Sequence, residues 1–73
     1  MPASRPPTSG LGSAAAELSS MATAVDELTR RVTAIADDYR AARRDDLAAE
    51  LFKAERALIG ARRNLERVVG WDR

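Results

Sequence analysis

The sequence predicts an all-α fold, a coiled-coil-like antiparallel hairpin of two helices, and three observations predict it. Apolar residues recur from Leu18 to Ala42 at alternating steps of three and four, the spacing of a heptad stripe on a helix. A second stripe with the same spacing runs from Leu47 to Val68. The step of five between the stripes coincides with residues 43–46, where two arginines precede two aspartates. Cations are favourable at the end of a helix and anions at the start of the next, so this order indicates a break between two helices.

Composition limits the size of the domain and its chemistry. The chain has 73 residues, and a core of that size rarely supplies more than about 3–5 kcal/mol. It contains no cysteine and no histidine, which removes disulfides, thiolate metal sites and the commonest general base. Twelve basic and eleven acidic residues nearly cancel, so the chain has no strong attraction to nucleic acid or anionic lipid. We therefore expect its stability to depend on self-association or on a partner protein.

The first twelve residues differ in composition from the rest. They hold all three prolines and two of the four glycines, so we interpret residues 1–12 as a disordered tail. They lack the apolar core of a secretory signal, and no apolar run in the chain reaches membrane-spanning length. The many arginines and alanines are typical of GC-rich bacterial genomes. These features favour a bacterial cytoplasmic protein that does not associate with membranes.

The structured part is predicted to be residues 13–73, and its first helix spans about 13–43. Ser13 is the predicted N-cap, because its hydroxyl can accept a hydrogen bond from a free amide of the first turn. The phase break and the charge reversal predict a turn at about 44–46.

The second helix is predicted over about 46–70. Asp45 or Asp46 would cap its start, and Gly70 fits the left-handed position just past a helix end. The predicted turn contains neither glycine nor proline, so one long kinked helix is the alternative to the hairpin.

Folding the chain back at this turn brings the two stripes into antiparallel register. Ile35 then lies level with Ala54, and Leu28 lies level with Ala61. A large side chain opposite an alanine lets two helices approach closely and interdigitate. We therefore expect the two stripes to pack against each other, which favours the hairpin over the long helix.

Beside the stripes, one flank of the predicted hairpin is small and apolar, and an exposed apolar strip usually marks an association surface. We predict that two hairpins join there as a homodimer that completes a four-helix bundle, or that the flank binds another helical protein. The predicted interface residues are Ala36, Ala48, Phe52, Ile59, Val69 and Trp71. The alternatives are that Phe52 and Ile59 widen the core of the hairpin, and that Trp71 plugs its end.

The sequence therefore predicts a small non-catalytic protein–protein interaction module. With no histidine, no cysteine and no glycine-rich phosphate loop, nothing indicates an enzyme, a cofactor or a small-molecule substrate. Adjacent aspartates on a helix do not converge, so the pairs at 37–38 and 45–46 do not predict a metal site. The alternative is a nucleic-acid-associated regulator, which the interspersed acids and the lack of a DNA-binding pattern disfavour. It would use Arg40, Arg43, Arg44, Arg62 and Arg63.

Overall fold

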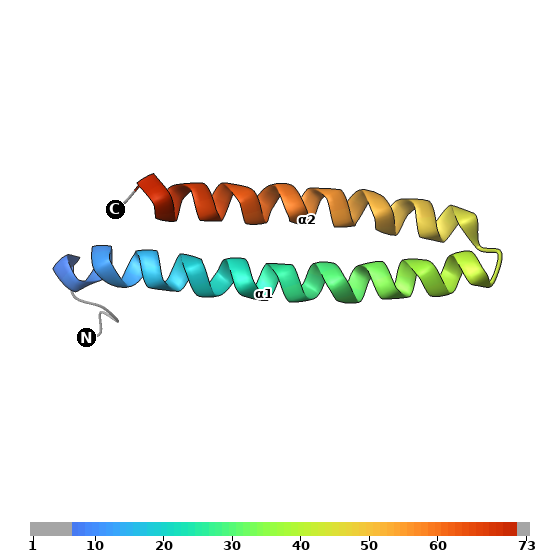
Figure 1. The fold of residues 1–73 in the computed structure, drawn as a ribbon, viewed down its shortest axis with the longest axis horizontal. Coiled ribbons are helices and arrows are strands. Elements are labelled where there is room, and N and C mark those ends of the chain that lie inside the picture. The colour runs from blue at the N-terminus through green and yellow to red at the C-terminus, as the bar shows by residue number, and fades with distance from the viewer. Residues whose placement is uncertain (1–6, 72–73) are drawn as a thin grey trace.

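Two antiparallel helices make up the part of the chain that the structure describes. This computed structural model describes residues 7–71, with side chains from residue 13 onward. Helix α1 spans Pro7–Ala41 and helix α2 spans Asp45–Trp71, and they lie side by side with a tight turn at one end (Figure 1). The longest dimension is 52 Å, as expected for a 35-residue helix at about 1.5 Å per residue. The predicted hairpin is confirmed, and the alternative of one long helix is wrong.

Helix α1 begins earlier than predicted. Its first residue is Pro7, so Ser13 lies inside the helix and the predicted tail extends too far along the chain. Proline suits the first position of a helix, because its φ angle is already helical and the N–H that it lacks would be unpaired there anyway. The prediction treated the prolines only as helix breakers and missed this exception. The rest of the predicted tail, residues 1–6, lies outside the described residues.

The turn is a compact helix cap closed by backbone hydrogen bonds. Arg43 adopts the left-handed conformation, with a φ angle of 66°. The N–H of Arg44 donates to the carbonyl oxygen of Tyr39 at 2.8 Å, and the N–H of Arg43 donates to that of Arg40 at 3.0 Å. These two bonds make a Schellman motif, which usually places glycine at the left-handed position. Arginine occupies that position here, so the turn carries no glycine signal in the sequence.

Helix α2 starts without an aspartate at its cap position. The N–H of Ala48 donates to the carbonyl oxygen of Arg44 at 3.0 Å, which makes Arg44 the N-cap residue. The prediction of Asp45 or Asp46 as the cap is therefore wrong. Both are helical residues of the first turn, where a negative charge is favourable beside the unpaired amides.

Small side chains, rather than the predicted stripes, occupy the centre of the contact between the helices. On α1 the most buried residues recur every seven positions. On α2 the most buried residues are Ala48 and Val69, and two partly buried charged residues lie between them at the same seven-residue spacing. This contact strip consists of Ala22, Thr29 and Ala36 of α1 and of Ala48, Glu55, Arg62 and Val69 of α2. By contrast, Met21, Leu28 and Ile35 are about half exposed. The prediction that the stripes pack against each other is therefore wrong for these outer residues, while other stripe residues, such as Val25, Val32 and Leu51, are half-buried beside the contact between the helices.

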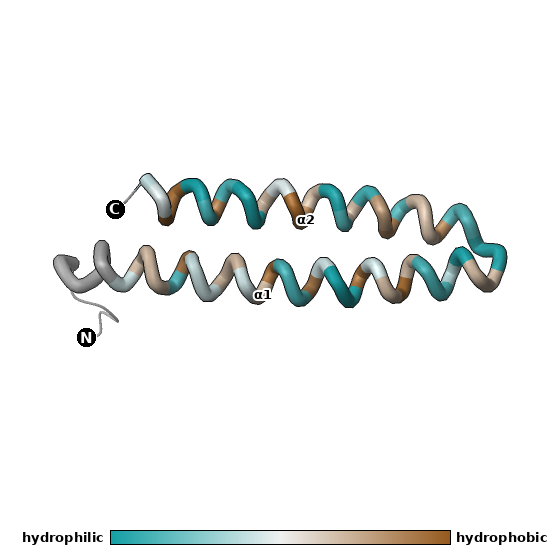
Figure 2. Tube along the Cα trace, viewed as in Figure 1, coloured by the Kyte–Doolittle hydropathy of each residue, from teal (hydrophilic) through white to brown (hydrophobic). Residues whose placement is uncertain are grey.

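Side-chain size explains this arrangement. Ala36 is 0% exposed and Ala48 is 2% exposed, because alanine lets a neighbouring helix approach closely. The polar member of the strip on α1, Thr29, is satisfied within its own helix: its Oγ1 donates to the carbonyl oxygen of Val25 at 2.8 Å. Figure 2 shows hydrophobic segments at regular intervals along both helices, while the turns of α2 that point away from α1 are mostly hydrophilic.

Helix α2 continues to the last described residue. Gly70 is helical, and no glycine in the described part has a positive φ angle, so the predicted left-handed cap at Gly70 is wrong. Within residues 7–71, neither helix combines the length and the hydrophobicity needed to cross a bilayer.

Candidate interaction surface

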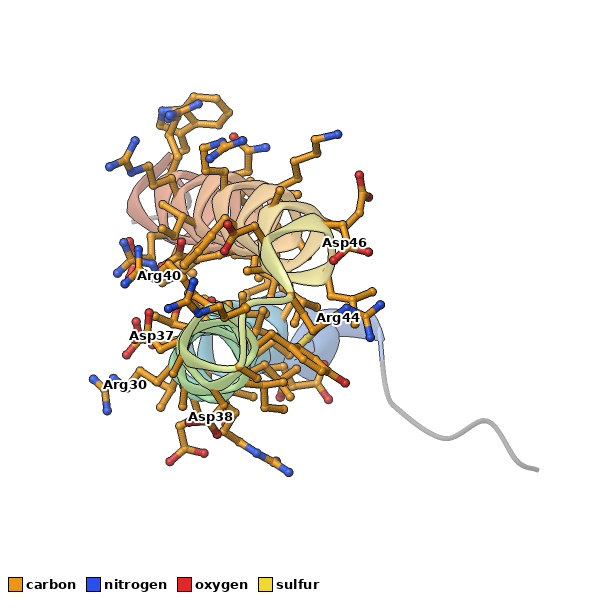
Figure 3. The ribbon with its side chains drawn as sticks, turned by 90° about the vertical axis from the view of Figure 1, so that its right-hand side faces the viewer. Arg30, Asp37, Asp38, Arg40, Arg44 and Asp46 are labelled. Atoms are coloured by element: carbon orange, nitrogen blue, oxygen red, sulfur yellow. The ribbon has the colours of Figure 1, made fainter. Side chains whose placement is uncertain are left out.

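Polar and charged side chains line one edge of the hairpin, together with Phe52. Thr33 Oγ1 donates a hydrogen bond to Glu55 Oε2 at 2.7 Å, and the guanidinium carbon of Arg40 lies 5.6 Å from the centre of the Phe52 ring. Figure 3, which looks along the helices from the turn, shows Arg40 on one side of the molecule, together with Arg30 and Asp37. We call this the mixed edge. It is lined by Asp26, Thr33, Arg40, Phe52, Ile59 and Glu66.

The opposite edge holds both predicted stripes side by side. On each helix, the residues four positions after a contact-strip residue lie on the mixed edge. The residues three positions after a contact-strip residue are rotated from the strip by about 60° in the opposite direction, so they lie on the other edge. Residues one position before the strip are rotated the same way, by about 100°. We call the resulting surface the apolar face. It consists of Leu18, Met21, Val25, Leu28, Val32, Ile35 and Tyr39 of α1 and of Leu47, Leu51, Ala54, Leu58, Ala61, Leu65 and Val68 of α2.

The apolar face leaves large side chains in contact with solvent. Met21 is 52% exposed, Leu28 47% and Ile35 50%, and they follow each other at one-heptad intervals along α1. Tyr39 and Val68 are exposed on the same face. A contiguous apolar patch on an otherwise charged surface usually marks a site of association. The apolar face is therefore the candidate functional site of the described residues.

The residues predicted for the partner interface are divided between the inside and the outside of the hairpin. Ala36, Ala48 and Val69 belong to the contact strip, and each is buried against the other helix of the same chain. Phe52 and Ile59 are half-buried on the mixed edge. A side chain that is buried within one chain gives little area to a partner. The structure therefore places the exposed apolar surface on the edge opposite the predicted flank.

Trp71 is the sixth predicted interface residue, and 76% of it is exposed. The alternative prediction, a plug packed against the end of the hairpin, is therefore wrong. Trp71 lies two positions after Val69 of the contact strip, about 160° around the helix from it, so it points away from α1 and lies outside the apolar face.

Sequence reasoning missed the outward orientation of Met21, Leu28 and Ile35. The contact strip and the row of large residues beside it have the same seven-residue period. Sequence reasoning therefore assigned the centre of the contact between the helices to the larger residues. The signal that could have separated them is the series of small residues one position after each, including Ala22 and Ala36. Small residues at a heptad interval favour close helix contact, which displaces larger neighbours to the outside.

Three of the five arginines of the alternative nucleic-acid function lie near acidic side chains. Arg40 Nη2 is 3.2 Å from Asp37 Oδ1, and Arg62 Nη1 is 3.7 Å from Glu66 Oε2. In Figure 3, Arg44 lies on the opposite side of the molecule from Arg40. Arg40 and Arg44 therefore do not belong to one one-sided basic field of the kind that favours nucleic-acid binding.

An ion pair marks the turn end of the molecule. Arg44 Nε lies 3.3 Å from Asp46 Oδ1, and Arg44 Nη2 lies 3.4 Å from Asp46 Oδ2. The hydrogen bond from Arg44, assisted by one from the backbone N–H of Leu47, lowers the pKa of Asp46 below its usual value. The same bond raises the pKa of Arg44, and the nearby Tyr39 contributes slightly in the same direction.

One depression, with a volume of about 410 Å³, opens between the helices at the end distant from the turn. Its charged residues already have partners: Asp26 Oδ2 lies 2.7 Å from Arg30 Nη2, and Arg62 pairs with Glu66. Among the described residues, no three histidine, cysteine or acidic side chains are grouped where they could hold a metal ion. The depression therefore offers no specific chemistry for a ligand. It is lined by Ser19, Ala22, Thr23, Asp26, Arg62, Glu66, Val69 and Gly70.

Comparisons of the chain with protein-family models, with curated proteins and with solved structures found no match.

Proposed function

We propose that this protein is a small non-catalytic interaction module, which binds a helical protein surface through its apolar face. The observation that carries the proposal is the row formed by Met21, Leu28 and Ile35, each about half exposed and one heptad apart. A heptad row is the pattern with which one helix inserts side chains between those of another. The expected partner is therefore a helix or a pair of helices, whether from another protein or from a second copy of the chain.

The chemistry of the two edges supports this choice of surface. On the mixed edge, polar groups already have partners: Thr33 donates to Glu55, and Arg40 lies near both Asp37 and Phe52. The apolar face has aliphatic side chains whose contact with water is unfavourable, at about 25 cal/mol for each Å² of apolar surface. Covering the apolar face therefore gives the larger gain in free energy.

A photo-crosslinking amino acid at position 28 tests the proposal in the cells that make the protein. Leu28 lies on the apolar face, whereas Ala34 is exposed and on the outward side of α1, so the same group at position 34 is the matched control. We expect covalent products with protein from position 28 and few from position 34. Equal yields from both positions, or none from position 28, would contradict the proposal.

A further inference from the structure

Given the proposed function, on which this inference rests, we infer that the occupant of the apolar face is a second copy of this chain. The two hairpins pack face to face about a two-fold axis that runs parallel to the helices. This axis places α1 of one protomer over α2 of the other, in antiparallel orientation, with both turns at the same end. The product is a four-helix bundle in which every neighbouring pair of helices is antiparallel.

The register of the hairpin makes the apolar face complementary to itself. Thr33 meets Glu55, and Arg40 meets Phe52, which fixes the heights at which residues of α1 and α2 correspond. The outer residues of the apolar face continue this antiparallel register. The pairs at equal height are Met21 with Val68, Leu28 with Ala61, and Ile35 with Ala54.

Within one chain these pairs lie on neighbouring helices and point the same way, so they leave Leu28 and Ile35 about half exposed. The two-fold axis parallel to the helices brings the pairs together between protomers. Leu28 of one protomer then lies over Ala61 of the other, and Ile35 lies over Ala54. Each large side chain fills the space above an alanine, and each pairing occurs twice.

A two-fold axis perpendicular to the helices gives poorer packing. It lays α1 over α1 and α2 over α2. Leu28 of one protomer then lies near Ile35 of the other, while Ala54 and Ala61 meet other small side chains. Large-on-large and small-on-small contacts leave one half of the interface crowded and the other half with voids, and both are destabilising. The size pattern therefore selects the parallel axis.

The area of the apolar face matches what a stable dimer needs. The 27 residues of α2 extend for about 40 Å, and two helices side by side are about 20 Å wide. The footprint of the face is therefore about 800 Å², which is about the area that each partner buries in an interface of standard size. A second copy covers the whole face without any change in the fold of the hairpin.

Disulfide trapping tests the arrangement directly, because the sequence contains no cysteine that could interfere. Chains with Leu28→Cys are mixed with chains with Ala61→Cys under mild oxidation. We expect a mixed covalent dimer to form on the order of a hundredfold faster than from the control mixture of Ala34→Cys and Ala61→Cys, because a shared interface gives an effective concentration in the millimolar range. The pair Ile35→Cys and Ala54→Cys gives a second, independent trap if Leu28→Cys weakens the dimer.

The molar mass of the unmodified protein, measured by light scattering, completes the test. Twice the chain mass of 7.9 kDa is expected. A monomer at every concentration would overturn the inference but not the proposed function, whose own test is crosslinking from position 28. A dimer in which neither cysteine pair forms faster than the control would overturn the parallel axis.

Discussion

The backbone N–H of Arg44 donates to the carbonyl oxygen of Tyr39 at 2.8 Å, and the residue that makes this bond possible is Arg43, in the left-handed conformation. The chain reverses through this bond, so the geometry of the hairpin depends on a conformation that side chains with a Cβ atom disfavour.

Replacing Arg43 with glycine is expected to stabilise the hairpin. The left-handed conformation costs a residue with a Cβ atom about 1–2 kcal/mol, and the greater chain entropy of glycine offsets part of the gain. We expect Arg43→Gly to raise the free energy of unfolding by about 0.5–1 kcal/mol, measured by urea denaturation at a fixed protein concentration. Arg43→Ala is the control, since it removes the charge but keeps the Cβ atom, and it should leave stability nearly unchanged. Equal effects of the two substitutions would show that charge, not backbone conformation, limits the turn.

Enlarging the contact strip is expected to separate the helices. Ala36 is fully buried, so Ala36→Leu forces α2 away, and overpacking of this kind costs about 1–3 kcal/mol. Ala34→Leu adds the same atoms to an exposed position of the same helix and should change the unfolding free energy little. Thermal unfolding followed by circular dichroism compares the two variants. If both melt like the unmodified protein, the contact between the helices is not centred on Ala36.

The two-helix topology was predictable from the sequence because the phase break and the charge reversal fall at the same place. The facing surfaces were not, because hydrophobic periodicity gives greater weight to large residues such as Leu28 than to Ala22 and Ala36. The contact strip of α2 was also hard to predict, because it contains the charged residues Glu55 and Arg62, which are usually exposed to solvent. Glu55 can lie there because Thr33 supplies a hydrogen bond from the opposite helix, a partner that only the folded chain brings into reach.

The Thr33–Glu55 hydrogen bond is expected to contribute measurably to stability. It joins a hydroxyl to a carboxylate at 2.7 Å in a partly buried position, and a hydrogen bond to a charged group contributes about 1.5–3 kcal/mol, less where water has access. We expect Thr33→Val to lower the free energy of unfolding by about 1 kcal/mol. A double-mutant cycle with Glu55→Gln isolates the coupling between the two side chains. Additive effects would mean that Thr33 and Glu55 do not interact in solution.

The loss of stability at acid pH is expected to depend on Asp46. Its folded-state pKa is lowered by Arg44, so its contribution is fully present above the unfolded-state pKa and is lost as the pH falls through the lower, folded-state pKa. Asp46→Asn should therefore reduce stability at neutral pH and have no effect at strongly acid pH. The titration of Asp46, followed by nuclear magnetic resonance, should shift to higher pH in Arg44→Met. An unchanged midpoint in that variant would show that Arg44 does not hold the carboxylate.

The contact strip and the apolar face occupy adjacent positions of the same heptads, yet one holds the chain together and the other faces outward. Under the proposed function, substitutions at Leu28 or Ile35 would alter the choice of partner with little loss of fold, whereas those at Ala36 or Ala48 are constrained by the fold itself. Because the residues that hold the helices together are distinct from those of the apolar face, the apolar face can be redesigned without changing the contact between the helices.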